Sequence, residues 1–198
     1  MKTLIIDIET KPNADLVELF NNKIKPDSRL KDPVKIEASI EKQKAESVKK
    51  MSVDTDFSTV FCVGVHDLEE NKSEVLKFEE FIKKLNEIAK TGLYKIVTFN
   101  GQDFDLPILL KQCIKNKLEV PAGLKDCQKR YSDKHIDLMK LIGVYGKYKS
   151  LDMYLQIYLG IAKKEIDFET CTDQELKDHC LEDIENTAKL YKLFREIC

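Results

Sequence analysis

Short runs of apolar and β-branched side chains, separated by polar residues, recur in the first half of the chain. Residues 3–8, 59–67, 74–78 and 94–99 show this pattern, which is typical of β-strands. The first run, TLIIDI, is apolar almost throughout, and it predicts a buried central strand.

Apolar residues at helical spacing follow these runs. Residues 78–89 predict an amphipathic helix, and similar patterns predict helices at about 105–116 and at 151–159. Gly160 can end the third of these as a C-cap. The last helix begins with a capping-box pattern at Thr172 and runs towards the C-terminus. Strands followed by interleaved helices indicate an α/β fold, a mixed sheet covered by helices.

Residues 31–53 differ from the rest of the chain. Their charges alternate, their apolar periodicity is weak, and pairs such as Glu46 with Lys50 favour an exposed helix. We interpret the segment as a charged helical insertion between the first two strands. A solvated surface helix is the ordinary role for such a segment, and a substrate clamp or partner surface is the alternative.

The length and composition set limits on this interpretation. A chain of 198 residues fits one ordinary domain, so we expect a single domain over residues 1–198. The net charge of −2 argues against a protein that coats a nucleic-acid duplex, because phosphate contacts need many Lys and Arg side chains. It allows an enzyme that grips only the end of a strand.

The cysteines and the N-terminus indicate the surroundings of the protein. The six cysteines form no CxxC pair, which favours reduced, partly buried thiols over a zinc site. The opening stretch MKTLIIDIET is too short and too acidic for a signal peptide, and no apolar run is long enough to span a bilayer. We therefore expect a cytoplasmic protein without membrane contact.

Acidic residues in the first predicted strand are the first candidate for chemistry. Asp7 and Glu9 are two positions apart, so they project from the same face of the strand. Two carboxylates in so apolar a strand are costly unless a cation, a proton or hydrogen bonds compensate them. The alternative is a strand end that reaches solvent.

The second candidate lies in residues 99–110, FNGQDFDLPILL, between a strand and a helix. Asp105 stands at the start of the helix, where an aspartate is often only a cap, and Asp103 could serve the same purpose. A loop that leaves a strand end is also where sheet proteins present catalytic side chains. Asn100 and Phe104 add an amide donor and an aromatic face that suit a nucleotide.

The third candidate is the final helix. Asp183 falls on its apolar stripe, where a carboxylate requires a partner. His179 lies four positions earlier, on the same face. A surface His–Asp pair is the alternative, and the apolar neighbours argue against it.

In this order the three blocks resemble the DEDD exonucleases, which include the proofreading domains of DNA polymerases and several RNA-trimming nucleases. DIET at 7–10 resembles the first motif, NGxxFD ending at Asp105 the second, and the helix with Asp183 the third. HIDLM at 135–139 and SLDMYLQIYLG at 150–160 resemble supporting stretches. The chain is most similar to bacterial and phage exonucleases that look like the proofreading domain of family B polymerases.

The resemblance implies a ribonuclease H-like fold, a mixed five-stranded sheet with helices on both faces. It also implies a metal-dependent 3′–5′ exonuclease that releases nucleoside 5′-monophosphates from single-stranded 3′ ends. Two divalent cations, Mg²⁺ or Mn²⁺, are hard ions that prefer oxygen ligands. The implied ligands are Asp7, Glu9, Asp105 and Asp183.

His179 departs from the pattern of the most similar branch, which has a tyrosine four positions before the last aspartate. The histidine branch usually places its histidine five positions before. The identity of the proton acceptor is therefore open, although a histidine with a pKa near neutrality is a better base than a phenol.

Substrate contacts are expected at the strand end. Thr10 and Asn100 could hold the terminal sugar, and Phe104 could stack on a base, contacts that tolerate any sequence. Candidates for phosphate contacts are the basic and aromatic residues of two loops, for which an ordinary solvated surface is the alternative. They are Lys125, Lys129, Arg130, Lys134, Tyr145, Lys147, Tyr148 and Lys149.

Other functions stay open at this point. The substrate is more readily DNA, but the same fold and ions could trim RNA, because nothing in the sequence reports on the 2′-hydroxyl. A non-catalytic module that binds single strands is a second alternative. A third treats the carboxylates as caps and surface pairs. Protein partners cannot be inferred.

Overall fold

The computed structural model describes residues 1–129, 132–164, 166–168 and 170–197. The chain forms two compact units. One contains residues 1–9 and everything from residue 60 onward, and the other contains residues 10–59. The single domain expected from the length stays a prediction. Arg130, a predicted phosphate contact, and Cys198, the last of the six cysteines, lie outside the described residues.

The larger unit is built on a five-stranded mixed sheet with the order β3-β2-β1-β4-β5. β1 and β4 are parallel, as are β4 and β5, whereas β2 and β3 are antiparallel. This is the mixed α/β sheet that the sequence predicts. The strands are β1 (Lys2–Pro12), β2 (Ser58–Asp67), β3 (Lys72–Leu76), β4 (Tyr94–Thr98) and β5 (His135–Asp137).

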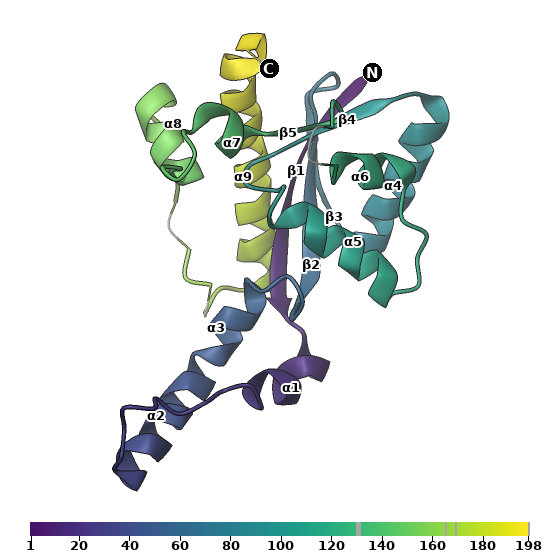
Figure 1. Cartoon of the computed structure of the whole chain (residues 1–198). Coiled ribbons are helices and arrows are strands. Elements are labelled where there is room, and N and C mark those ends of the chain that lie inside the picture. Colours follow the sequence, from purple (N-terminus) through teal and green to yellow (C-terminus); the bar gives the residue numbers. More distant parts are fainter. Residues whose placement is uncertain (130–131, 165, 169, 198) are drawn as a thin grey trace. The chain divides into compact units, whose positions relative to one another are not determined.

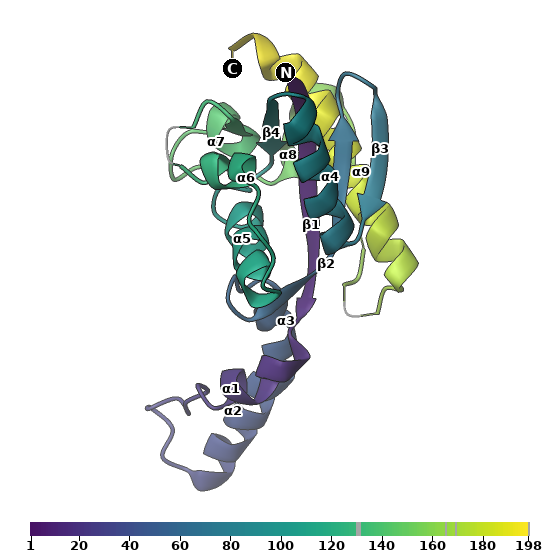
Figure 2. The ribbon, with the colours of Figure 1, turned by 90° about the vertical axis from the view of Figure 1, so that its right-hand side faces the viewer.

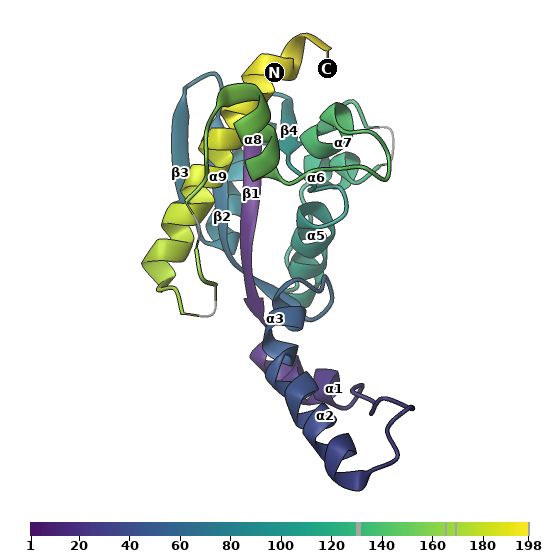
Figure 3. The same ribbon diagram turned by 90° about the vertical axis from the view of Figure 1, so that its left-hand side faces the viewer.

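Helices cover both faces of this sheet (Figure 1). α4, α5 and α6 lie on one face (Figure 2), and α7, α8 and α9 lie on the other (Figure 3). These helices are α4 (Phe78–Thr91), α5 (Asp105–Lys115), α6 (Ala122–Cys127), α7 (Leu138–Ile142), α8 (Leu151–Leu159) and α9 (Asp173–Phe194), followed by the short 3₁₀ helix η2 (Arg195–Ile197).

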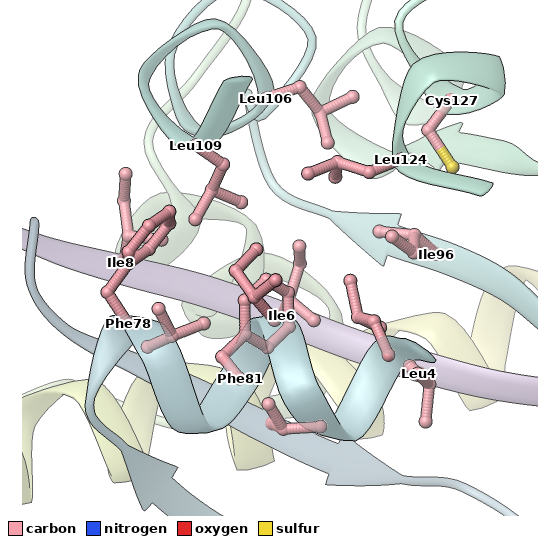
Figure 4. Close-up of a cluster of buried hydrophobic side chains, with 14 of the residues drawn as sticks. Leu4, Ile6, Ile8, Phe78, Phe81, Ile96, Leu106, Leu109, Leu124 and Cys127 are labelled. Atoms are coloured by element: carbon pink, nitrogen blue, oxygen red, sulfur yellow. The ribbon is translucent and has the colours of Figure 1, made fainter. Parts of the chain in front are cut away.

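β1 separates two hydrophobic cores because its side chains alternate between the faces of the sheet. Leu4, Ile6 and Ile8 pack with side chains of α4, α5 and α6 (Figure 4). Ile5 packs on the opposite face with α8 and α9. β1 is therefore buried on both faces, as its composition predicts.

The smaller unit holds the charged segment predicted to be helical. Its helices are η1 (Ala14–Leu16), α1 (Val17–Asn21), α2 (Pro33–Ala45) and α3 (Ser47–Ser52). Asp32 caps α2, which has no buried residue, and Lys50 pairs with Glu46 at 3.0 Å. The fully buried Met51 and an edge-to-face contact between Phe20 and Phe57 supply apolar packing.

The helix ends follow the sequence signals. Gly160 ends α8 in the left-handed conformation, with φ 65°. Thr172 and Glu175 form the predicted capping box of α9. The third strand was predicted to reach residue 78; it ends at Leu76, because Phe78 already begins α4. No disulfide links the five cysteines that the structure describes.

Gly64 of β2 lets α9 approach the sheet closely. A Cβ atom at this position would lie 2.9 Å from Sγ of Cys180 and 2.9 Å from Cγ2 of Ile184. Real Cβ contacts are longer, so any side chain here would push α9 away from β2. The position of α9 relative to the sheet depends on this missing side chain.

We expect Gly64→Ala to destabilise the protein by about 1–3 kcal/mol through overpacking. Gly92→Ala is the matched control, since its Cβ would meet nothing within 4 Å and its backbone is extended. Urea unfolding of both variants measures the difference. Equal stability of the two variants would show that the contact of α9 with β2 is not tight.

Candidate active site

Asp7 and Glu9 project from β1 towards α9. Ile6 and Ile8, their neighbours along the strand, belong to the core under α4, α5 and α6, so the two carboxylates lie on the other face. Sγ of Cys180 in α9 lies 3.9 Å from Oδ2 of Asp7. One ligand atom each of Asp7, Glu9 and Cys180 can be chosen so that all three lie within 4.8 Å of one another.

The loop from β4 to α5 is shaped by a buried carboxylate, that of Asp137. Its oxygens accept hydrogen bonds from the backbone N–H groups of Asn100 at 3.0 Å and Gln102 at 3.1 Å. Asn100 adopts the left-handed conformation with φ 65°, which asparagine tolerates better than most residues. A Cβ atom on Gly101 would lie 2.4 Å from the Thr98 side chain, so only glycine fits there.

This loop delivers Asp105 to the sheet. Asp105 is the first residue of α5 and is 3% exposed. The N-cap residue is Phe104, which forms no side-chain cap, so neither Asp103 nor Asp105 has the capping role considered from the sequence. The Asp105 carboxylate instead accepts a backbone hydrogen bond from Ile8 of β1.

α9 adds the histidine and the last carboxylate. Nε2 of His179 lies 3.7 Å from Oδ2 of Asp183 and 4.0 Å from Oε1 of Glu9. All three side chains are more than 85% buried. The exposed ring of Phe168 packs edge-on against the imidazole of His179, with 5.3 Å between ring centroids. The structure thus places Nε2 of His179 near both Glu9 and Asp183, while Asp105 and Asp183 act on Asp7 through their charges.

Lys163 is part of this cluster and was missed in the sequence. Its ammonium lies 2.5 Å from Oδ1 and 2.7 Å from Oδ2 of Asp183. The shorter contact is an ion pair without hydrogen-bond geometry, so Oδ1 has no hydrogen-bond partner among the described residues. The backbone N–H of Lys163 donates to Asp152 of α8 at 3.0 Å, which anchors the lysine.

Burial and mutual repulsion raise the pKa values of three of the carboxylates, those of Asp7, Glu9 and Asp105. Burial, followed by the charges of Asp105, Glu9 and Asp183, raises the pKa of Asp7 well above its usual range. Burial first and the charge of Asp183 second raise the pKa of Glu9 to about 8. Burial raises the pKa of Asp105 to about 7, against the effect of its backbone hydrogen bonds. These carboxylates need positive charge before all of them can ionise at neutral pH.

Burial favours the neutral form of His179. Burial is the largest effect and lowers the pKa of His179, while the charge of Asp183 acts in the opposite direction. A neutral imidazole near neutral pH can accept a proton.

The predicted substrate contacts are placed less clearly. Thr10 belongs to the smaller unit, where its hydroxyl donates to the Ser52 carbonyl at 2.5 Å. Phe104 is half-buried against the core, and Asn100 stands at the end of β4. Among the predicted phosphate contacts, Lys129 and Lys134 both pair with Asp126 at 2.7 Å. The roles of all these residues stay predictions.

The donor set fits hard divalent cations. Asp7, Glu9, Asp105 and Asp183 offer carboxylate oxygens, the ligands that Mg²⁺ and Mn²⁺ prefer. Oδ1 of Asp183 is buried and accepts no hydrogen bond within the described residues, and the Lys163 ammonium pairs with it at 2.5 Å. Burial is the largest cause of the raised pKa values of Asp7 and Glu9, and the charge of Lys163 offsets it only in part.

Comparison with known proteins agrees with the geometry. A five-stranded mixed sheet between two layers of helices defines the ribonuclease H-like class of α/β folds. Residues 40–196 match the family described as predicted 3′–5′ exonuclease related to the exonuclease domain of PolB. The chain belongs to this family.

Two polymerases are similar to the chain. DNA polymerase 1 of Sulfolobus acidocaldarius is 29% identical over 160 residues, a match covering 73% of this chain and 17% of the polymerase. The family B DNA polymerase of Pyrobaculum calidifontis superposes with a TM-score of 0.60 at 14% identity, over 98% of this chain and 24% of that one. The chain thus spans less than a quarter of the length of either polymerase.

Among the described residues, no helix is long and apolar enough to cross a membrane.

The pKa of Glu9 predicts how the stability of the metal-free protein depends on pH. Because its pKa rises from 4.5 unfolded to about 8 folded, the folded state binds the proton more tightly, and stability falls as pH rises through this window. Glu9→Gln cannot ionise. Above pH 8 we expect the free energy of unfolding of Glu9→Gln to be at least about 1 kcal/mol higher than that of the wild type. Near pH 4 the two proteins should be equally stable.

Urea unfolding at several pH values, with a chelator present, measures this difference. Glu119→Gln changes an exposed residue and should follow the wild type at every pH. A Glu9→Gln protein that loses stability at high pH as steeply as the wild type would contradict the pKa shift.

Proposed function

We propose that the chain is a 3′–5′ exonuclease that removes nucleoside 5′-monophosphates from the 3′ end of single-stranded DNA by a two-metal-ion mechanism. The observation that carries the proposal is the convergence of Asp7, Glu9 and Asp183 beside His179, together with the charge of Asp105 acting on Asp7. The motifs DIET and NGxxFD and the family match support it independently.

Asp7, Glu9, Asp105 and Asp183 would hold the cations in this mechanism. Divalent ions supply Lewis-acid stabilisation of the scissile phosphate and of the departing 3′ oxygen. The carboxylates also repel phosphate, so the nucleic acid binds productively only where their charge is neutralised. Lys163, paired with Asp183, already neutralises part of that charge.

His179 would accept the proton of the attacking water at Nε2. That nitrogen faces the cluster, between the carboxylates of Glu9 and Asp183. Its lowered pKa keeps it unprotonated at neutral pH, which a general base requires. The histidine would thereby serve where a tyrosine stands in the branch that the sequence resembles.

Phe168 contacts His179, Asn100 lies in the loop that precedes Asp105, and Thr10 follows Glu9 in the chain. Phe168 is 60% exposed beside His179 and is suited to stack on a base. A hollow of about 270 Å³ is lined by His179 together with Lys164, Asp167, Glu175 and Glu182, among others.

Digestion of a 5′-labelled single strand with Mn²⁺ tests the proposed function. We expect a descending ladder with the wild type and loss of at least about 100-fold in rate with Asp105→Asn, because an uncharged amide holds a metal ion poorly. Asp103→Asn is the matched control, two positions away and 67% exposed, and should keep the wild-type rate. Asp7→Ala should abolish the ladder.

The same assay separates the alternatives. A ladder on RNA of matched sequence, with little digestion of DNA, would favour an exoribonuclease. Binding of the single strand without release of mononucleotides would favour a non-catalytic module. An intact substrate with both Mg²⁺ and Mn²⁺, without binding of either ion, would leave the carboxylates as structural groups.

The role of His179 predicts a change in the pH profile. We expect His179→Ala to lower kcat by about 10²-fold or more, with a small change in KM. In the wild type kcat falls with decreasing pH as His179 takes up a proton below its ordinary pKa of 6.5, and the variant should lack this acidic limb. Gln174→Ala, an exposed position on the same helix, should keep both the rate and the limb. Full activity of His179→Ala would assign the base to another group.

A further inference from the structure

Two cysteine thiols lie against the carboxylates of the candidate active site. Cys180 is fully buried on α9, and its Sγ lies 3.8 Å from the backbone oxygen and 3.9 Å from Oδ2 of Asp7. Cys62 is 2% exposed on β2, forms a side-chain hydrogen bond with Cys180, and its charge would act on Glu9. Two sulfur and two carboxylate donors from β1, β2 and α9 therefore adjoin one another.

The packing holds the sulfur of Cys180 in this place. Gly64 leaves room for α9 at the point where Cys180 contacts β2, since a Cβ atom there would lie 2.9 Å from Sγ. The thiol thus has a fixed position beside Asp7. Sulfur donors add nothing to the binding of Mg²⁺, which takes oxygen ligands.

Thiophilic ions use the same donors differently. Zn²⁺ and Cd²⁺ take thiolate and carboxylate ligands together, with Zn–S near 2.3 Å and Zn–O near 2.0–2.2 Å in the case of zinc. One ligand atom each from Asp7, Glu9 and Cys180 already lies within 4.8 Å of the others.

We propose that Cys180, Asp7 and Glu9, with Cys62 as a neighbouring fourth donor, form a binding site for a thiophilic divalent cation such as Zn²⁺. Binding forms a metal–sulfur bond and releases the thiol proton to solvent. The ion coordinates carboxylates that Mg²⁺ or Mn²⁺ would need, and it links Asp7 to Cys180 of α9. This inference rests on the proposed function: binding of zinc at this site would inhibit the exonuclease.

Titration of the metal-free, full-length protein with Cd²⁺ tests the site without any substrate. Thiolate bound to cadmium gives an ultraviolet charge-transfer band. We expect the band with the wild type and a loss of at least about tenfold in Cd²⁺ affinity with Cys180→Ser. Cys113→Ser, a buried cysteine of the opposite core, is the matched control and should keep the wild-type titration.

Cys180→Ala serves as a second variant should serine disturb the packing of α9, and circular dichroism checks the fold of each protein. Excess Mn²⁺ should weaken the apparent Cd²⁺ affinity of the wild type, because the two ions share carboxylates. Absence of the band in the wild type, or an undiminished band in both Cys180 variants, would overturn the site.

Inhibition is measured separately, as the ratio of nuclease rates with and without Zn²⁺ in each protein. We expect this ratio to fall more steeply with Zn²⁺ in the wild type than in Cys180→Ser. An equal fall in both would refute the inhibitory role. If the band depends on Cys180 but the protein has no nuclease activity, the cation site is supported and only the proposed function is rejected.

Discussion

Repulsion among buried carboxylates is the constraint on which the site depends. β1 is the central strand of the sheet, and it carries Asp7 and Glu9 on the face that α9 covers. Asp183 and Asp105 act on Asp7 from α9 and α5. One ammonium, that of Lys163, cannot neutralise four carboxylates, so the metal-free protein keeps protons on some of them. The proposed cations would relieve this repulsion.

The surrounding structure holds these groups in place against their repulsion. Asp137 fixes the loop before Asp105 by accepting backbone hydrogen bonds, and the Ile8 N–H binds the Asp105 carboxylate directly. Gly64 lets α9 bring His179 and Asp183 close to the sheet. Holding these groups together lowers the stability of the fold, but it places them in advance where a charged ligand can bind, as is common in such sites.

The sequence predicted the parts of this arrangement that depend on local periodicity. Strand alternation places Asp7 and Glu9 on one face, and helical spacing places His179 within 3.7 Å of Asp183. The α/β class and the resemblance to polymerase proofreading domains are confirmed by the topology and the family match. The roles of the individual site residues stay predictions.

Long-range contacts account for what the sequence did not predict. Lys163 is one of 33 basic residues, and only the fold shows that it meets Asp183. β5 has three residues, too few for a recognisable alternation. The approach of Cys62 and Cys180 to the carboxylates depends on how α9 packs on β2, which no local pattern encodes.

The loop after β4 is held by hydrogen bonds to its backbone amides. Its conformation therefore depends little on which side chains it carries. Asp137 binds the main chain at Asn100 and Gln102, whereas the side chain of Asp103 is exposed and pairs only with Lys140 among the described contacts. A residue at position 103 can therefore change in size or charge without moving Asp105. Substitutions at this position can therefore alter the rim of the candidate site while the Asp105 carboxylate keeps its place.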